Sequence, residues 1–135
     1  MENKKSINTK TYVIIAIIVV AIIIIGYLIS SFDNSINGIT IEEEQLVTTS
    51  TAIKGGYLYP ILYVKVKNTS NKTKKVSFEA NFYADGNLLG DDQASYVVLA
   101  PGDEYVLTAQ SDRGYSCLSS HEYSYNITKW WIFDQ

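Results

Sequence analysis

The hydrophobic and polar residues of this chain follow two different patterns. From Thr11 to Phe32 the chain has 22 residues without a charge, and from Ile39 onward apolar and polar residues alternate in short runs. An uncharged run of this length rises about 33 Å as a helix, which matches a hydrocarbon core of about 30 Å. The pattern therefore divides the chain near residue 33 into an apolar part and a period-two part.

The apolar run predicts one transmembrane helix over residues 11–32. Its section from Tyr12 to Ile29 contains thirteen Ile, Val or Leu residues, which at roughly −0.4 kcal/mol each favour insertion by about 5 kcal/mol. β-Branched residues favour strands in water, but a single chain in lipid satisfies its backbone hydrogen-bonding groups only as a helix. The alternative is a cleaved secretory signal, whose apolar region is usually shorter, about 7 to 15 residues.

Flanking charges predict how this signal anchor is oriented. Lys4, Lys5 and Lys10 lie in the basic N-terminus over residues 1–10, and the first charge after the run is Asp33. Positive residues flanking a membrane helix stay on the cytoplasmic side. We therefore expect a single-pass cell-membrane protein with a cytoplasmic N-terminus and an extracellular C-terminal domain.

The C-terminal part is predicted to be an all-β domain over residues 39–135, joined to the helix by a polar linker over residues 33–38. In the segments ILYVKVKN and VSFEANFYA, apolar residues alternate with polar ones, which puts one face of each strand in a core. The connector NTSNKTKK between them is interpreted as a hairpin loop. The residues predicted to face the core are Leu62, Val64, Val66, Val76, Phe78, Ala80 and Phe82.

Further short strands complete the predicted domain. They are expected at residues 39–49, 95–100, 104–110 and 122–129, with turns at ADGN, APGD and SDRG. One sheet of this size would leave its apolar face in water, so two packed sheets are expected. The pattern predicts a small immunoglobulin-like antiparallel sandwich.

The segments LYVKVKNTSNKTKKVSFEANFYADGNLLG and LAPGDEYVL resemble the FxLYD and DUF4352-like group of bacterial extracytoplasmic immunoglobulin-like domains. The likeness spans residues 62–107, and of the F-x-L-Y-D motif the aligned segment keeps only Tyr83. The resemblance implies a module of envelope-attached proteins without catalytic residues. The matching residues are Val66, Asn68, Thr69, Phe82, Tyr83, Asp85, Gly86, Leu99, Pro101 and Gly102.

Composition narrows the classes of partner. Eight Lys or Arg and thirteen Asp or Glu follow residue 32, a net charge of −5. An acidic domain of this kind is a poor match for nucleic acid or for anionic lipid. Cys117, the only cysteine, forms no internal disulfide and is interpreted either as a small buried residue or as a thiol that bridges a dimer. Abundant Ile and Asn with a single cysteine are typical of a bacterial secreted domain.

Nothing in the sequence predicts an enzyme or a bound cofactor. His121 is the only histidine, and its four-residue spacing from Cys117 does not by itself bring a thiol and an imidazole into hydrogen-bonding distance. The acidic clusters lack the alternating spacing of a dedicated calcium loop, so solvated turn residues are expected there. A weak divalent-ion site between two loops is the alternative.

Aromatic residues provide the candidate interaction surface. Side chains of this type are favoured at protein interfaces, and they also stack on sugar rings or fill small cores. We predict that the WWIF tail lies beyond the last strand and meets a partner or the membrane surface. The candidate residues are Tyr57, Tyr59, Tyr63, Trp130, Trp131 and Phe133.

Taken with the predicted anchor, these features predict a non-catalytic β-sandwich that mediates protein interaction at a bacterial cell surface. A module that binds cell-wall glycan or a divalent ion is the alternative. A subunit that acts inside the membrane through its Ile-rich helix is the third hypothesis, and replacement of that helix by an unrelated apolar one distinguishes it from a plain anchor.

Overall fold

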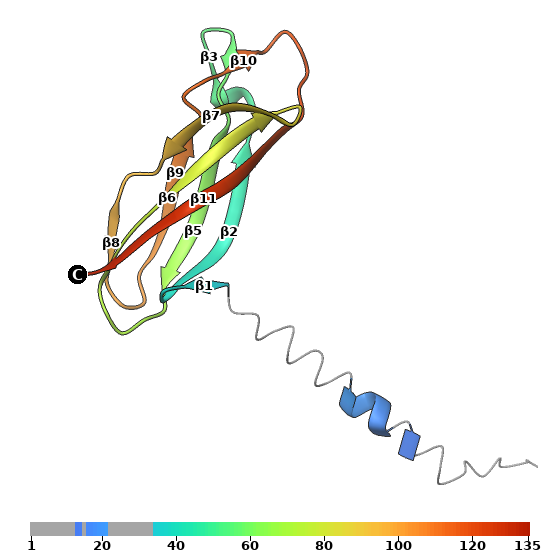
Figure 1. The fold of residues 1–135 in the computed structure, drawn as a ribbon, viewed down its shortest axis with the longest axis vertical. Coiled ribbons are helices and arrows are strands. Elements are labelled where there is room, and N and C mark those ends of the chain that lie inside the picture. Colours follow the sequence, from blue (N-terminus) through green and yellow to red (C-terminus); the bar gives the residue numbers. More distant parts are fainter. Residues whose placement is uncertain (1–12, 15, 22–33) are drawn as a thin grey trace, which may run out of the picture. The chain divides into compact units, whose positions relative to one another are not determined.

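The computed structural model describes residues 13, 14, 16–21 and 34–135 (Figure 1). The chain divides into two units, Met1–Asp33 and Asn34–Gln135. Residues 13, 14 and 16–21 are helical. Within the described ranges, no helix has both the length and the apolar character needed to cross a bilayer. Much of the predicted helix over residues 11–32, together with Lys4, Lys5 and Lys10, lies outside the described residues.

The second unit is an all-β sandwich of antiparallel strands, as the alternation predicted. One sheet has the order β1-β2-β5-β9, the other has the order β11-β6-β7 with β8 also paired to β6, and a small third sheet has the order β10-β4-β3. A single short 3-10 helix, η1, precedes β3. The elements are β1 (Ser35–Ile36), β2 (Ile39–Val47), η1 (Ser50–Ala52), β3 (Ile53–Lys54), β4 (Tyr57–Leu58), β5 (Ile61–Asn68), β6 (Lys74–Ala84), β7 (Asn87–Gln93), β8 (Val97–Leu99), β9 (Glu104–Gln110), β10 (Tyr115–Ser116) and β11 (Tyr123–Asp134).

The core lies between the two larger sheets and is centred on alternate residues of β5 and β6. All seven residues predicted to face the core are fully buried. Leu107 and Ala109 of β9 and Ile39 of β2 complete the cluster from the first sheet. Alternation therefore identified the correct face of both central strands.

The prediction of a hairpin between β5 and β6 is wrong. β5 pairs with β2 and β9, whereas β6 pairs with β7, β8 and β11, so the connector over residues 69–73 carries the chain from one sheet to the other. Buried Asn68 holds this crossing. Its amide nitrogen donates to the carbonyl oxygens of Lys72 at 2.7 Å and Leu99 at 2.9 Å. Its side-chain oxygen accepts from the backbone N–H of Ser70 at 3.0 Å.

Turn residues occupy the conformations that their types favour. The β6–β7 turn has Asp85 at φ 52° and Gly86 at φ 79°, the left-handed pair of a type I′ hairpin. Gly102 has φ 88° in the predicted APGD turn. Part of the segment predicted as a linker over residues 33–38 is structured, because β1 forms an antiparallel pair with the start of β2.

The last strand is longer than predicted and includes the WWIF tail. β11 runs to Asp134 and pairs with β6 along its length. A β-bulge between Ile127 and Lys129 shifts the register. Because of this extra residue, Trp130 and Ile132 face the core after the bulge, as Tyr125 and Ile127 do before it. The tail therefore belongs to the sandwich.

Substitution of Asn68 tests the sheet crossing. We expect Asn68→Ala to lower the free energy of unfolding by about 3 kcal/mol, because it leaves two carbonyls and the Ser70 N–H without their partner. The matched control is Asn71→Ala in the same connector, whose exposed side chain should cost within about 0.5 kcal/mol. Urea unfolding of the full chain, followed by tryptophan fluorescence, measures both. Equal losses would contradict the role of Asn68.

Candidate functional site

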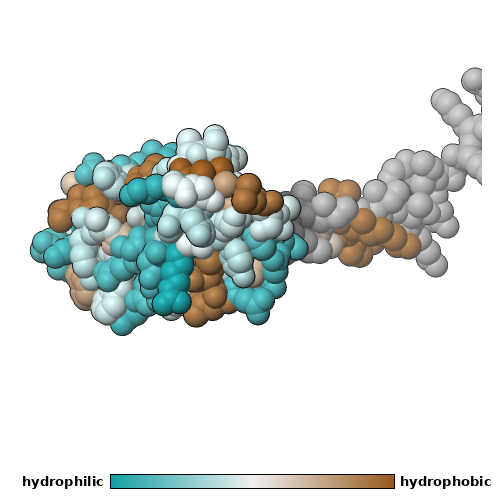
Figure 2. Space-filling model, turned by 90° about the horizontal axis from the view of Figure 1, so that it is seen from above, coloured by the Kyte–Doolittle hydropathy of each residue, from teal (hydrophilic) through white to brown (hydrophobic). Residues whose placement is uncertain are grey.

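The six predicted aromatic residues do not form one surface. Five of them lie in three separate places on the sandwich surface, and the sixth, Trp130, packs against the core. Figure 2 shows that exposed apolar side chains on the face drawn there form separate patches between hydrophilic ones. Tyr57 and Tyr59 line a groove, and Tyr63 lines a depression on the first sheet. Trp131 and Phe133 contact each other on the second sheet. Trp130 packs on Phe78 with ring centroids 5.4 Å apart.

The groove that contains Tyr57 and Tyr59 is lined by charged, polar and aromatic residues and has a volume of about 650 Å³. Its other side chains come from the β3–β4 hairpin and the ends of β7 and β9. Asp92 is tied to the fold, since its carboxylate accepts the backbone N–H of Gln110 at 2.9 Å. Asp112 similarly accepts the N–H of Asp91 at 3.0 Å. Exposed tyrosine beside carboxylate and amide groups is a combination that can stack on and hydrogen-bond a sugar.

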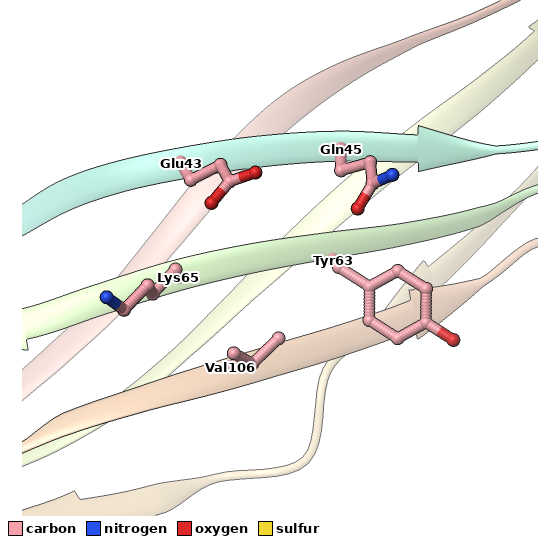
Figure 3. Close-up of a pocket in the computed structure, with 5 residues that line it drawn as sticks. All are labelled: Glu43, Gln45, Tyr63, Lys65 and Val106. Atoms are coloured by element: carbon pink, nitrogen blue, oxygen red, sulfur yellow. The ribbon is translucent and has the colours of Figure 1, made fainter.

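Tyr63 lies in a depression of about 330 Å³ on the outer face of the β2-β5-β9 sheet. Figure 3 shows Glu43 and Gln45 on one strand, Lys65 and Tyr63 on the next, and Val106 on the third. Cross-strand pairing places them together, because Glu43 pairs with Lys65 and Lys65 pairs with Val106. The result is an apolar centre, Tyr63 and Val106, beside charged and amide side chains.

Lys65 fixes the charge at the edge of this depression. Its ammonium lies 3.0 Å from Glu42 and 3.3 Å from Glu104. Hydrogen bonds to Glu42 and Glu104 and their negative charges raise the pKa of Lys65, and the hydrogen bond from Lys65 lowers the pKa of Glu104. These pairs are partly exposed, so they order the surface more than they stabilise the fold.

Nearby, a hydrogen bond closes one open side of the sandwich. The Tyr125 hydroxyl on β11 donates to the Glu44 carboxylate on β2 at 2.6 Å. Burial, followed by this hydrogen bond and the negative charge, raises the pKa of Tyr125 to about 12. The hydroxyl therefore remains protonated at neutral pH and bridges the two sheets.

The third set forms an aromatic patch, which we define as Tyr96, Val98, Trp131 and Phe133 with Lys75 and Lys129. The Phe133 ring lies 6.5 Å from that of Tyr96 and 6.4 Å from that of Trp131, measured between centroids. Lys75 lies 4.8 Å from the Tyr96 ring centroid, and Lys129 lies 3.4 Å from that of Trp131. The patch therefore combines the exposed side chains of Tyr96, Val98 and Phe133 and the half-buried Trp131 with two cations.

Among the described residues, His121 forms no hydrogen bond with the Cys117 thiol or with any of the predicted site residues. Its Nδ1 lies 2.6 Å from the Asp85 carboxylate, and its Nε2 lies 2.8 Å from the Ser119 hydroxyl. The Tyr115 ring stacks on the imidazole at a centroid distance of 4.2 Å. These contacts attach the loop before β11 to the β6–β7 turn, a link that no spacing in the sequence indicates.

Cys117 is exposed, so the interpretation as a small buried residue is wrong. The interpretation as a thiol for an intermolecular bridge stays a prediction. Over residues 34–135 and the described part of the helix, no group of three or more His, Cys, Asp or Glu side chains is placed to hold a metal ion. For the glycan of the alternative function, the groove lined by Tyr57 and Tyr59 is the candidate site.

Neither the comparison with family models nor the comparison with curated proteins found a match for this chain. The resemblance to the FxLYD and DUF4352-like group accordingly stays a prediction.

The Asp85–His121 contact predicts a defined dependence of stability on pH. Hydrogen bonds from His121 and from the Glu122 N–H lower the pKa of Asp85. The stabilisation should be fully present above the unfolded carboxyl pKa of about 3.9 and should disappear as pH falls through the lower folded value. Urea midpoints of wild type and Asp85→Asn should therefore differ near neutral pH and converge in acid.

The matched control for this experiment is Asp91→Asn, an exposed carboxylate on the neighbouring strand. Asparagine also tolerates the left-handed conformation at position 85, so backbone strain does not confound the comparison. A difference between wild type and Asp85→Asn that persisted unchanged in acid would contradict the ionic contribution.

Proposed function

We propose that this protein is a membrane-anchored, non-catalytic β-sandwich that mediates protein interaction at a bacterial cell surface. The observation that supports the proposed protein interaction is the depression on the outer face of the β2-β5-β9 sheet. Tyr63 and Val106 form its apolar centre, and Glu43, Gln45 and Lys65 surround them. An aromatic and aliphatic centre with a polar rim is the arrangement typical of protein interfaces.

The membrane location in this proposal is supported by the sequence of residues 11–32. Hydrophobic insertion and the flanking lysines favour a single-pass anchor with the sandwich outside the cell. An immunoglobulin-like topology related to the FxLYD group is part of the same proposal. It is supported by the two-sheet sandwich and by the turn residues that the resemblance includes, Asp85, Gly86 and Gly102.

The single cysteine provides a direct test of topology. Cys117 is exposed on the sandwich, so a membrane-impermeant maleimide should label it in intact bacterial cells that express the full chain. Cys117→Ser is the control for background labelling. Labelling that requires cell lysis would contradict an extracellular domain.

A photo-crosslinking amino acid at position 106 tests the proposed interface. Val106 is 47% exposed, so its replacement should not disturb the core. We expect a discrete crosslinked partner in cells, and we expect Tyr63→Ala to reduce its yield about tenfold by removing an aromatic anchor. The matched control places the same amino acid at Asn87, an exposed position on the β6–β7 turn. Identical adducts from both positions, unaffected by Tyr63→Ala, would contradict the proposal.

A second candidate function, glycan binding, is favoured by the groove at the β3–β4 end, where Tyr57 and Tyr59 lie beside Asp92, Gln110 and Asp112. Calorimetry of the full chain with soluble cell-wall fragments should detect binding that Tyr57→Ala weakens about tenfold, equivalent to about 1.4 kcal/mol of lost stacking. Tyr105→Ala is the matched control, because Tyr57 and Tyr105 are 50% and 51% exposed. Binding that both variants retain would exclude the groove as the site.

A further inference from the structure

We infer that the aromatic patch docks on the lipid headgroup region of the membrane to which the chain is anchored. This inference rests on the proposed membrane anchoring and adds a second contact to it. The patch is not one of the two pockets assigned above to a protein or a glycan. Three observations support it: the composition of the patch, its place in the sandwich and its charge.

The composition of the patch matches a membrane interface. Val98, Lys75 and Phe133 lie side by side across β8, β6 and β11, because both Val98 and Phe133 pair with Lys75. Val98 is 55% exposed and Phe133 is 48% exposed, although both side chains are apolar. Aromatic rings and lysine side chains are favoured where hydrocarbon meets headgroups, because each has an apolar body and the lysines keep a charged tip in water.

The chain connection limits how far this end of the sandwich can be from the membrane. The membrane segment predicted from the sequence ends at residue 32 and the second unit begins at Asn34, so one residue separates them along the chain. One or two residues span at most about 7 Å. In the proposed anchored protein, so short a connection would keep β1 near the headgroups.

β8 and the C-terminal end of β11, which contribute to the aromatic patch, lie toward the same end of the domain as β1 (Figure 1). The N–H of Thr69 bonds to the carbonyl of Gly38 beside β1, and the N–H of Gln135 bonds to the carbonyl of Thr73 in the same connector. The β1–β2 turn and the end of β11 therefore meet the connector that follows Asn68. Phe133 is two residues from Gln135 and therefore lies near the same connector. If the outer face of the second sheet turns toward the membrane, the patch can reach the lipid.

Local charge at the patch differs from the net charge of −5. Lys75 and Lys129 lie over its aromatic rings, and Lys72 at the adjacent connector pairs with Asp134. Glu79 is the acidic residue that pairs across strands with Lys129. The two cations can contact headgroup phosphates, while the charged row of Glu42, Lys65 and Glu104 lies on the other sheet.

Spin labels at two matched valines test this docking. The full chain, with Cys117→Ser, carries Val98→Cys in one variant and Val106→Cys in the other, and is reconstituted in phosphatidylcholine–phosphatidylglycerol vesicles. The two valines are similarly exposed on the outer faces of opposite sheets. We expect the label at 98 to have a several-fold higher ratio of oxygen to aqueous nickel-chelate accessibility than the label at 106. Phe133→Ser with Lys75→Glu should remove that difference.

The outcomes separate this inference from the proposed anchoring. Vesicle flotation first reports whether the chain is inserted. A chain that floats, with equal accessibility at positions 98 and 106, would overturn the docking and leave the anchor intact. A chain that does not float would overturn both. We expect the unfolding midpoint of the Phe133→Ser, Lys75→Glu variant to match that of the wild type, because Phe133 is 48% exposed and Lys75 lies beside it on the outer face.

Discussion

The burial of alternate side chains of β5 and β6 against each other is the constraint on which the rest of the sandwich depends. Each strand presents a continuous apolar face, and those faces are covered only if the two strands lie in different sheets. The chain must then cross between the sheets immediately after β5. Buried Asn68 makes that crossing compatible with the core, because it satisfies carbonyls in the connector and at the end of β8. A polar residue thus defines the edge of the apolar core.

Alternation in the sequence identified the central strands β5 and β6 with their buried faces and located β2, β8, β9 and the start of β11. It did not identify β7 or the short strands β1, β3, β4 and β10. It was not sufficient to identify strand partners, because a polar connector such as NTSNKTKK fits a hairpin and a crossing equally well. The end of β11 was missed for a different reason. The bulge before Lys129 shifts the buried positions from odd to even numbers, so the period-two pattern is interrupted inside one continuous strand.

The candidate surfaces show a similar limit. Tyr57, Tyr59 and Tyr63 are close in sequence, yet the first two line the end groove and the third lies on an open sheet face. Their partners, Asp92, Gln110 and Val106, come from strands far along the chain, so only strand pairing brings them together. His121 is comparable, since its contact with Asp85 joins residues 36 positions apart. Local composition therefore identified suitable residue types without grouping them into sites.

The proposed anchor would lower the affinity that each proposed surface needs. A tethered domain already has an effective concentration in the millimolar range at the membrane, so a patch worth only a few kcal/mol is enough to bias its orientation. Two lysines at about 1 kcal/mol each and two exposed rings are of that order. Such an orientation would place the second sheet against lipid and leave the face with Tyr63 and Val106 toward the solvent. In the proposed anchored protein, docking of the second sheet would leave the opposite sheet available to the proposed partner.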